Sequence, residues 1–336
     1  MRGPAVDQLK QAIPHSCTAV TTETGATLPK IRIIGAPSSL GLRPSDAGHE
    51  PETWRAPQVL LDHGLARITA AHDVQTLAHP TYMAEAQDGT RIRNGHSIRE
   101  YSLKLADRVH QVLASGDFPL VIGGDCSILL GCLLGARRHG SLGLIHLDGH
   151  TDFFHPGNYD STQRLGSVAG MDLALATGRG EELLTRWPDV EGVLAEDEDV
   201  IQVGERDTGS PDFVGYFADI QSTRMTRITM QELFAAGVDA TGRRLLDHLQ
   251  ERQLSNVWLH VDLDILDQTY LPAVDSPGSP GLGYEDLSQM VGGILASGRV
   301  AGMNITIYDP GLDPGLRCAP KIVEALGSSL ARLVRS

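Results

Sequence analysis

Short apolar runs recur along the chain and alternate with longer segments in which the apolar positions follow helical spacing. Such short, nearly unbroken runs are typical of strands that a parallel sheet buries on both faces. They predict strands over residues 31–35, 118–122, 142–147, 200–204, 257–261 and 303–308. The segments between them predict helices over residues 56–63, 97–115, 129–138 and 284–297. This alternation predicts an α/β fold in which helices cover both faces of a parallel sheet.

The composition supports a large globular core. Hydrophobic residues make up 41% of the 336 residues and charged residues 21%, which excludes a mainly disordered chain. At roughly 150 residues per domain the length would allow two domains, but no linker, internal repeat or low-complexity tract divides the pattern. We therefore expect a loosely ordered N-terminal arm over residues 1–29 and a single α/β domain over residues 30–336.

The charge balance argues against two classes of partner. With a formal net charge of −14, the chain is repelled by nucleic-acid phosphates and by anionic membrane surfaces. No stretch reaches the ~18 apolar residues of a membrane span, and the first residues lack the apolar core of a secretory signal. The four cysteines form neither a CxxC pair nor a disulfide framework. We therefore expect a reduced, cytoplasmic protein.

Three polar motifs directly follow predicted strands, where open α/β sheets bind their ligands. They are Gly-Gly-Asp-Cys-Ser at 123–127, His-Leu-Asp-Gly-His-Thr-Asp at 146–152 and His-Val-Asp-Leu-Asp at 260–264. Side chains of extended backbone alternate between two faces. If the chain stays extended, Asp148, His150 and Asp152 therefore face the same way, and so do Asp262 and Asp264.

Four carboxylates at one point would repel strongly and could not all ionise in a dry site. Divalent cations remove this conflict, and carboxylates with one imidazole suit a metal such as Mn²⁺. The charge favours two ions, the arrangement used for hydrolysis. A single Asp-x-Asp at a strand end is also a common turn or helix cap, but both motifs in one chain favour a metal site. Structural zinc prefers Cys and His ligands, so a catalytic site is the better interpretation.

These motifs resemble those of the ureohydrolases, a family of arginases, agmatinases, guanidino-acid hydrolases and formiminoglutamases. Gly-Gly-Asp-Cys-Ser resembles the family's Gly-Gly-Asp-His-Ser, Asp-Gly-His-Thr-Asp resembles its Asp-Ala-His-x-Asp, and Asp-Leu-Asp-Ile-Leu-Asp resembles its Asp-x-Asp-x-x-Asp-Pro segment. The resemblance covers about residues 31–330. It implies a three-layer αβα sandwich around a mainly parallel sheet, a binuclear Mn²⁺ site at one sheet edge, and a homo-oligomer, either a trimer or a hexamer.

The resemblance also implies a role for each ligand. Asp148 and Asp262 would bridge the two metals; one metal would also take Asp152 and residue 126, and the other His150 and Asp264. A hydroxide held between the metals would attack the central carbon of a guanidinium or amidine. Asp152 would carry the proton to the departing amine, and arginine-like substrates would release urea.

The chain departs from the family at the first ligand and at the proton shuttle. Cys126 stands where most of the family has His. A thiolate could bind a metal and shift the preference towards Zn²⁺ or Fe²⁺, whereas the alternative is a small buried thiol. Ala169 stands where the family's proton-transferring His is expected. His155 could replace that His, or it could be a solvated loop residue.

A third departure concerns the substrate pocket. Ile307 stands near the family's guanidinium-binding Glu. Asp309 or Asp172 could supply the missing carboxylate, although either could equally be a cap.

The sequence thus predicts a metal-dependent hydrolase that cleaves a C–N bond of a small arginine-like, modified guanidine or amidine compound. The products would be urea or an amide, plus an amine. Two alternatives are a non-catalytic homologue acting as a scaffold or sensor, and a related fold that deacetylates at one metal. The native metal, the substrate and the oligomeric state are left open.

Overall fold

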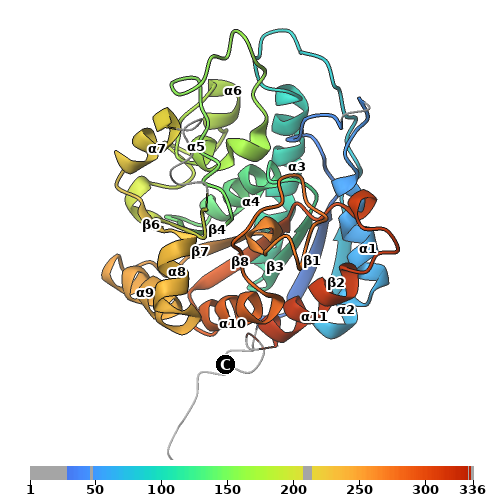
Figure 1. Cartoon of the computed structure of the whole chain (residues 1–336), viewed down its shortest axis with the longest axis vertical. Helices are drawn as coiled ribbons and strands as arrows, with labels where there is room; N and C mark the ends of the chain where they lie inside the picture. The colour runs from blue at the N-terminus through green and yellow to red at the C-terminus, as the bar shows by residue number, and fades with distance from the viewer. Residues whose placement is uncertain (1–28, 46–47, 207–213, 332, 334–336) are drawn as a thin grey trace, which may run out of the picture.

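Eight parallel strands form the central sheet in a computed structural model that describes residues 29–45, 48–206, 214–331 and 333 (Figure 1). The strands are β1 (Ile31–Ala36), β2 (Asp73–Thr76), β3 (Phe118–Gly123), β4 (Gly143–Leu147), β5 (Val200–Val203), β6 (Thr226–Ile228), β7 (Val257–Asp262) and β8 (Val300–Thr306). They lie in the order β2-β1-β3-β8-β7-β4-β5-β6, and each neighbouring pair is parallel. The predicted α/β fold with a parallel sheet is confirmed.

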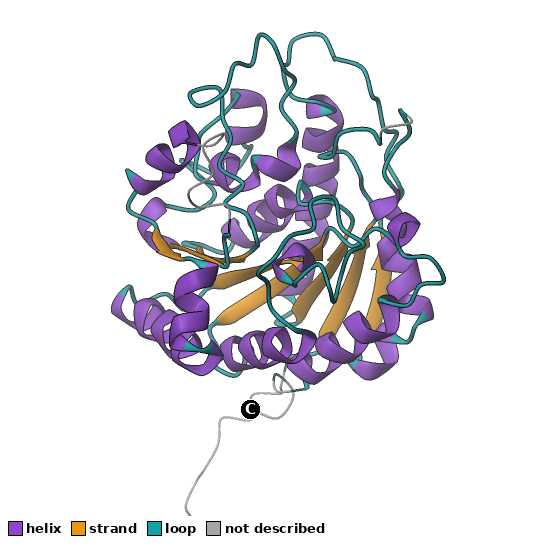
Figure 2. Ribbon diagram, in the orientation of Figure 1, coloured by secondary structure: helices purple, strands orange, loops and turns teal. Residues whose placement is uncertain are grey.

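Helices cover both faces of the sheet and complete the three layers (Figures 1 and 2). They are α1 (Ala56–Asp62), α2 (Leu65–Ile68), α3 (Gly95–Ala114), α4 (Ile128–Arg137), α5 (Asp172–Ala176), α6 (Glu182–Thr185), α7 (Val214–Gln221), α8 (Met230–Ala236), α9 (Val238–Glu251), α10 (Tyr284–Leu295) and α11 (Ala319–Leu330). The core divides into two hydrophobic clusters, one involving α1, α2 and α8–α11 and the other involving α3–α6.

The strands that the pattern missed are the two edges of the sheet. β2 is mostly exposed and β6 has three residues. An edge strand pairs on one side only and needs no apolar run, so neither shows the pattern of a buried strand. The four predicted helices agree with α1, α3, α4 and α10 to within about two residues, and β8 begins at Val300, three residues before the predicted start.

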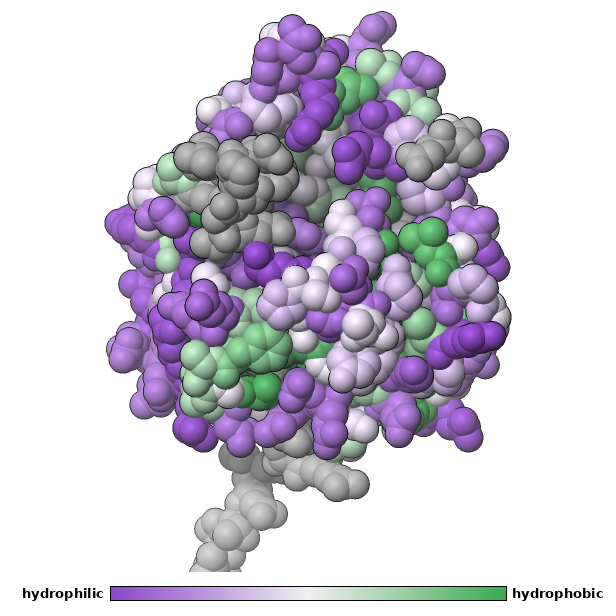
Figure 3. Space-filling model, in the orientation of Figure 1, coloured by the Kyte–Doolittle hydropathy of each residue, from purple (hydrophilic) through white to green (hydrophobic). Residues whose placement is uncertain are grey.

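The surface in Figure 3 is dominated by hydrophilic residues, and apolar side chains gather there only in small patches. Within the described residues, no helix combines the length and apolarity that crossing a bilayer requires. The predicted arm over residues 1–29 lies almost wholly outside the described residues. The division into an arm and one domain therefore stays a prediction.

Candidate metal centre

The loop from β3 into α4 carries Cys126 to the carboxyl edge of the sheet. A side chain at Gly124 would lie 2.0 Å from the Ser38 carbonyl oxygen, so only glycine allows the loop to pass the segment after β1. The neighbouring Asp125 carboxylate accepts hydrogen bonds from the Ser38 hydroxyl at 2.7 Å and from the Gly41 backbone N–H at 2.9 Å. These contacts fix the loop and place Cys126, which is 1% exposed, in the centre.

The segment after β4 turns sharply instead of staying extended. β4 ends at Leu147, and Asp152 has a φ of 46°, in the left-handed region that Asp tolerates better than most residues. The Asp148 carboxylate accepts the His150 backbone N–H at 2.6 Å, which bends the chain back on itself. The expectation of a continuous extended face was therefore wrong, although the side chains still converge: His150 Nδ1 lies 3.8 Å from Asp148 Oδ1.

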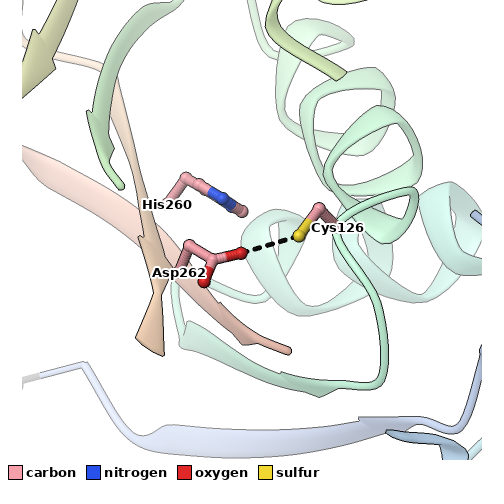
Figure 4. A group of neighbouring side chains, drawn as sticks. All are labelled: Cys126, His260 and Asp262. Carbon is pink, nitrogen blue, oxygen red and sulfur yellow. Dashed lines mark hydrogen bonds between the residues drawn. The ribbon is translucent and has the colours of Figure 1, made fainter. Parts of the chain in front are cut away.

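The segment after β7 places two carboxylates by a similar turn. Asp262 ends the strand, and its Oδ1 accepts the Asp264 backbone N–H at 2.8 Å. Its Oδ2 accepts the Cys126 thiol at 2.7 Å, and Figure 4 shows these two side chains pointing towards each other. Asp264 Oδ2 lies 2.7 Å from His150 Nδ1. The two carboxylates of this turn thus contact different partners: Asp262 contacts the Cys126 thiol, and Asp264 contacts the His150 imidazole.

The electrostatics of the centre call for cations. Burial raises the pKa of Asp148, Asp152 and Asp262 well above the usual Asp value, and the neighbouring carboxylates raise each of them further. Burial also opposes ionisation of Asp264, but His150 and the buried Arg206 outweigh it and lower the pKa of that carboxyl. Without a counter-charge, this many carboxylates cannot ionise together.

The donor set fits divalent metal ions. One group of potential ligands joins Asp148, His150 and Asp264, with ligand atoms within 4.8 Å of one another. A second group contains Cys126, His260 and Asp262. A third contains Asp148 and Asp152 together with His146. The six ligands that the sequence predicts therefore lie together at one edge of the sheet.

Comparison with known proteins places this centre in a family, because the model of the Arginase family matches residues 29–332. The chain belongs to the arginase family. It is 32% identical over 307 residues to an arginase from Bacillus caldovelox, covering 89% of this chain and 97% of that protein. An arginase from Bacillus subtilis is 28% identical over 81% of this chain and 92% of its own length. Proteins of this family are hydrolases that act on C–N bonds in linear amidines.

Solved structures agree with this assignment. The arginase of Bacillus caldovelox superposes with a TM-score of 0.75 at 28% identity and covers 90% of this chain and 98% of its own. A formimidoylglutamase from Bacillus subtilis has a TM-score of 0.67 at 20% identity, which shows the shared fold. The resemblance expected from the sequence is thus confirmed at the level of family and fold.

A cavity of about 310 Å³ opens beside the ligands. It reaches Cys126, His150, Asp152, Asp262 and Asp264 at its base. Its walls mix apolar with polar and charged side chains, and its lining includes Leu42, Phe154, Ala169, Met171 and Ile307 together with Arg43, Arg164, Asp275 and Ser276. This arrangement suits a small molecule with a polar end at the ligands.

Three other candidate residues do not line this cavity. His155 places its Nε2 against the Asp219 carboxylate, and its backbone N–H bonds Asn158. Asp309 accepts the backbone N–H groups of Glu52 and Gly311, which is the capping role considered as its alternative. Asp172 begins α5 and is fully buried.

Sequence reasoning missed two histidines beside the ligands. His146 on β4 and His260 on β7 are fully buried, and their rings stack with centroids 4.6 Å apart. Burial lowers the pKa of each to about 3. The signal was present, because each His stands two residues before a predicted ligand in an otherwise apolar strand and so faces the same side.

Proposed function

We propose that this chain is a metal-dependent hydrolase that cleaves a C–N bond of a guanidino or amidino compound. Membership of the arginase family supports the reaction class. The observation that carries the metal requirement is the convergence of buried carboxylates, an imidazole and a thiol at the base of one cavity. The metal and the substrate class proposed for this chain rest on the same geometry.

The ligand roles are those that the family resemblance implies. Asp148 and Asp262 would bridge two ions; Cys126 and Asp152 would complete one site, and His150 and Asp264 the other. The 2.7 Å contacts of Cys126 with Asp262 and of His150 with Asp264 support this division. Two bound cations would lower the pKa of water enough to supply hydroxide near neutral pH.

Asp152 is the proposed proton carrier. It lines the cavity beside Cys126, Asp262 and Asp264. A carboxylate there can take up a proton from the attacking water and donate it to a departing amine. The contact of His155 with Asp219 directs that ring to another partner, so His155 is the weaker candidate for this role.

The cavity wall favours a modified substrate over free arginine. Ile307 offers no charge to a guanidinium, and neither Asp172 nor Asp309 lines the cavity. Asp275 is the remaining carboxylate in the described lining besides the metal ligands, and it is exposed. An N-hydroxyguanidine or an amidine therefore fits at least as well as an unmodified guanidinium. Hydrolysis would release urea or an amide, plus an amine.

Mn²⁺ is the proposed metal because oxygen ligands predominate, with Zn²⁺ or Fe²⁺ as alternatives if the Cys126 thiolate binds. Desolvation and Asp262 raise the pKa of this thiol well above its usual value, so a bound cation would be needed to deprotonate it. A cytoplasmic location, a trimeric or hexameric homo-oligomer and the absence of nucleic-acid and membrane partners also stay predictions.

The test is hydrolysis of a panel of guanidines, N-hydroxyguanidines and amidines by the metal-loaded protein. Asp148→Ala should abolish turnover, whereas Asp247→Asn, which neutralises an exposed carboxylate on α9, should leave it unchanged. Turnover that survives Asp148→Ala would contradict the proposal. A wild-type chain that binds metal weakly and hydrolyses no compound would instead support the non-catalytic scaffold or sensor, which Cys126, Ala169 and Ile307 favour.

A further inference from the structure

Three fully buried polar side chains lie directly behind the proposed ligands and have no part in the proposed reaction. They are His146 on β4, His260 on β7 and Asp172 on α5. His146 and His260 are register partners of adjacent strands, so their rings stack. Together the three side chains offer two imidazoles and a carboxylate with ligand atoms within 4.8 Å. His260 also shares a donor group with Cys126 and Asp262, and His146 shares one with Asp148 and Asp152. The two histidines are therefore either cation ligands or hydrogen-bonded supports for the ligands.

The proton of His260 distinguishes these two possibilities. A metal takes the lone pair of one ring nitrogen, so a neutral ligand imidazole must carry its proton on the other. In the cluster, Nε2 of His260 faces the two carboxylates. A cation there requires the proton on Nδ1, whereas a supporting hydrogen bond requires it on Nε2.

Trp258 and Asn304 decide where the proton lies. An indole nitrogen can only donate, and Trp258 Nε1 donates to Asn304 Oδ1 at 2.7 Å. This contact turns the amide so that Asn304 Nδ2 lies 2.8 Å from His260 Nδ1 and donates to it. His260 therefore accepts at Nδ1 and carries its proton on Nε2.

Two carboxylate oxygens lie near the nitrogen that carries this proton, although beyond hydrogen-bond distance in the metal-free chain. His260 Nε2 lies 4.0 Å from Asp148 Oδ2 and 3.9 Å from Asp172 Oδ2. Neither oxygen has a hydrogen-bond partner among the described residues, and all three atoms are buried. His146 completes the contact, because its Nε2 lies 3.4 Å from Asp172 Oδ1 and 3.7 Å from Asp148 Oδ2.

We propose that Trp258, Asn304 and His260 are positioning residues that present an N–H to Asp148, and that the buried cluster is not a third cation site. This inference rests on the two-metal centre proposed above, because Asp148 is one of its bridging ligands. A donor behind a ligating carboxylate fixes its orientation, and loss of such a donor typically weakens metal binding about 10–100-fold. His260 acts through Asp148 and touches no substrate.

The test compares two substitutions of the same side chain in the full-length protein. His260→Gln keeps an N–H near the Nε2 position and an acceptor for Asn304, whereas His260→Leu keeps the volume and removes both. Mn²⁺ affinity is measured by competition with a chelator, bound metal by elemental analysis, and folding by the melting temperature of the metal-free protein. His260→Leu should weaken Mn²⁺ binding about 10–100-fold, and His260→Gln should stay within about threefold of wild type.

Two results would overturn the proposal. Three ions per wild-type chain, falling to two in both variants with unchanged affinity for those two, would establish a third cation site. Equal weakening in both variants would show that the N–H kept by Gln does not support the ligands. A chain that binds two ions but hydrolyses nothing would contradict the proposed function and leave this comparison valid.

A measurement without metal tests the tautomer itself. In metal-free protein carrying ¹⁵N-labelled histidine, NMR should find the His260 proton on Nε2. Trp258→Phe removes the donor that orients Asn304, so the variant should show a mixture of both tautomers. A wild-type His260 protonated on Nδ1 would refute the inference whatever the protein hydrolyses.

Discussion

Neutralising Asp262 should stabilise the metal-free protein and destabilise the metal-loaded one. Asp262 is 1% exposed, and its carboxylate lies beside Asp264 and Cys126. Asp262→Asn removes one buried charge from this cluster. The new amide oxygen can still accept the Asp264 backbone N–H, so the local turn is kept.

The size of the effect follows from Coulomb's law for two neighbouring carboxylates. Two like charges about 4 Å apart repel by about 4 kcal/mol at an effective dielectric constant of 20. Partial protonation in the metal-free state reduces this, and re-pairing the Asn amide costs about 1 kcal/mol. We expect a net gain of roughly 2 kcal/mol. At about 2.1 cal/mol/K per residue this corresponds to a rise of about 3 °C in Tm for the chain of 336 residues.

Metal should reverse the order of the two proteins. At a free metal concentration about 1,000 times Kd, binding stabilises the folded wild type by about 4.1 kcal/mol, or about 6 °C. Asp262→Asn lacks a bridging ligand and should gain less than about 1 °C under the same conditions. Wild type would then melt above the variant, whereas in chelator it would melt below it.

The assay is thermal unfolding at pH 8 of both proteins, each with excess chelator and with excess Mn²⁺. Asp247→Asn on α9 is the matched control, because it neutralises an exposed carboxylate and should follow wild type in both conditions. The reasoning is refuted if Asp262→Asn melts below wild type in chelator, or if Mn²⁺ raises its Tm as much as that of wild type.

Three further substitutions probe the departures from the family. Cys126→Ser should shift the bound Mn²⁺ to Zn²⁺ ratio at least about tenfold towards Mn²⁺ under equal supply, because a hydroxyl is a harder ligand than a thiolate; an unchanged ratio means that the thiol is not a ligand. Burial raises the pKa of Asp172 to about 7, so in metal-free protein its stabilising effect is complete below pH 3.8 and is lost as the pH rises through 7. Between pH 5 and 8, the free energy of unfolding of the wild type should fall by roughly 2–3 kcal/mol more than that of Asp172→Asn, as measured by urea unfolding. An equal fall in both proteins would contradict the raised pKa of Asp172. Ile307→Glu should raise kcat/KM for unmodified guanidines about 10–100-fold through a charged hydrogen bond, and unchanged selectivity would place the guanidinium elsewhere.

The sequence predicts the central strands because burial on both faces leaves a run of apolar residues. β4 and β7 are examples, and each is fully buried. The edge strands β2 and β6 pair on one side only, so their residues carry no such constraint and the pattern missed them. The order of the strands also depends on crossovers that periodicity does not encode.

The candidate ligands could be found from spacing, but not their geometry. The alternation of side chains along extended backbone predicted that Asp148 and His150 face the same way. In the structure, a backbone turn and the left-handed conformation of Asp152 bring these side chains together instead. The same alternation rule, applied two residues earlier, would have found His146 and His260. Their partners Asn304 and Asp172 come from distant segments, and only the folded chain places them behind Asp148.

The count of metal ions per chain tests the central claim most directly. It requires elemental analysis of protein purified without chelator from cells supplied with Mn²⁺. We predict two divalent ions per chain, held by Asp148 and Asp262 with their four neighbouring ligands. A chain that holds one ion or none under these conditions would contradict the binuclear hydrolase.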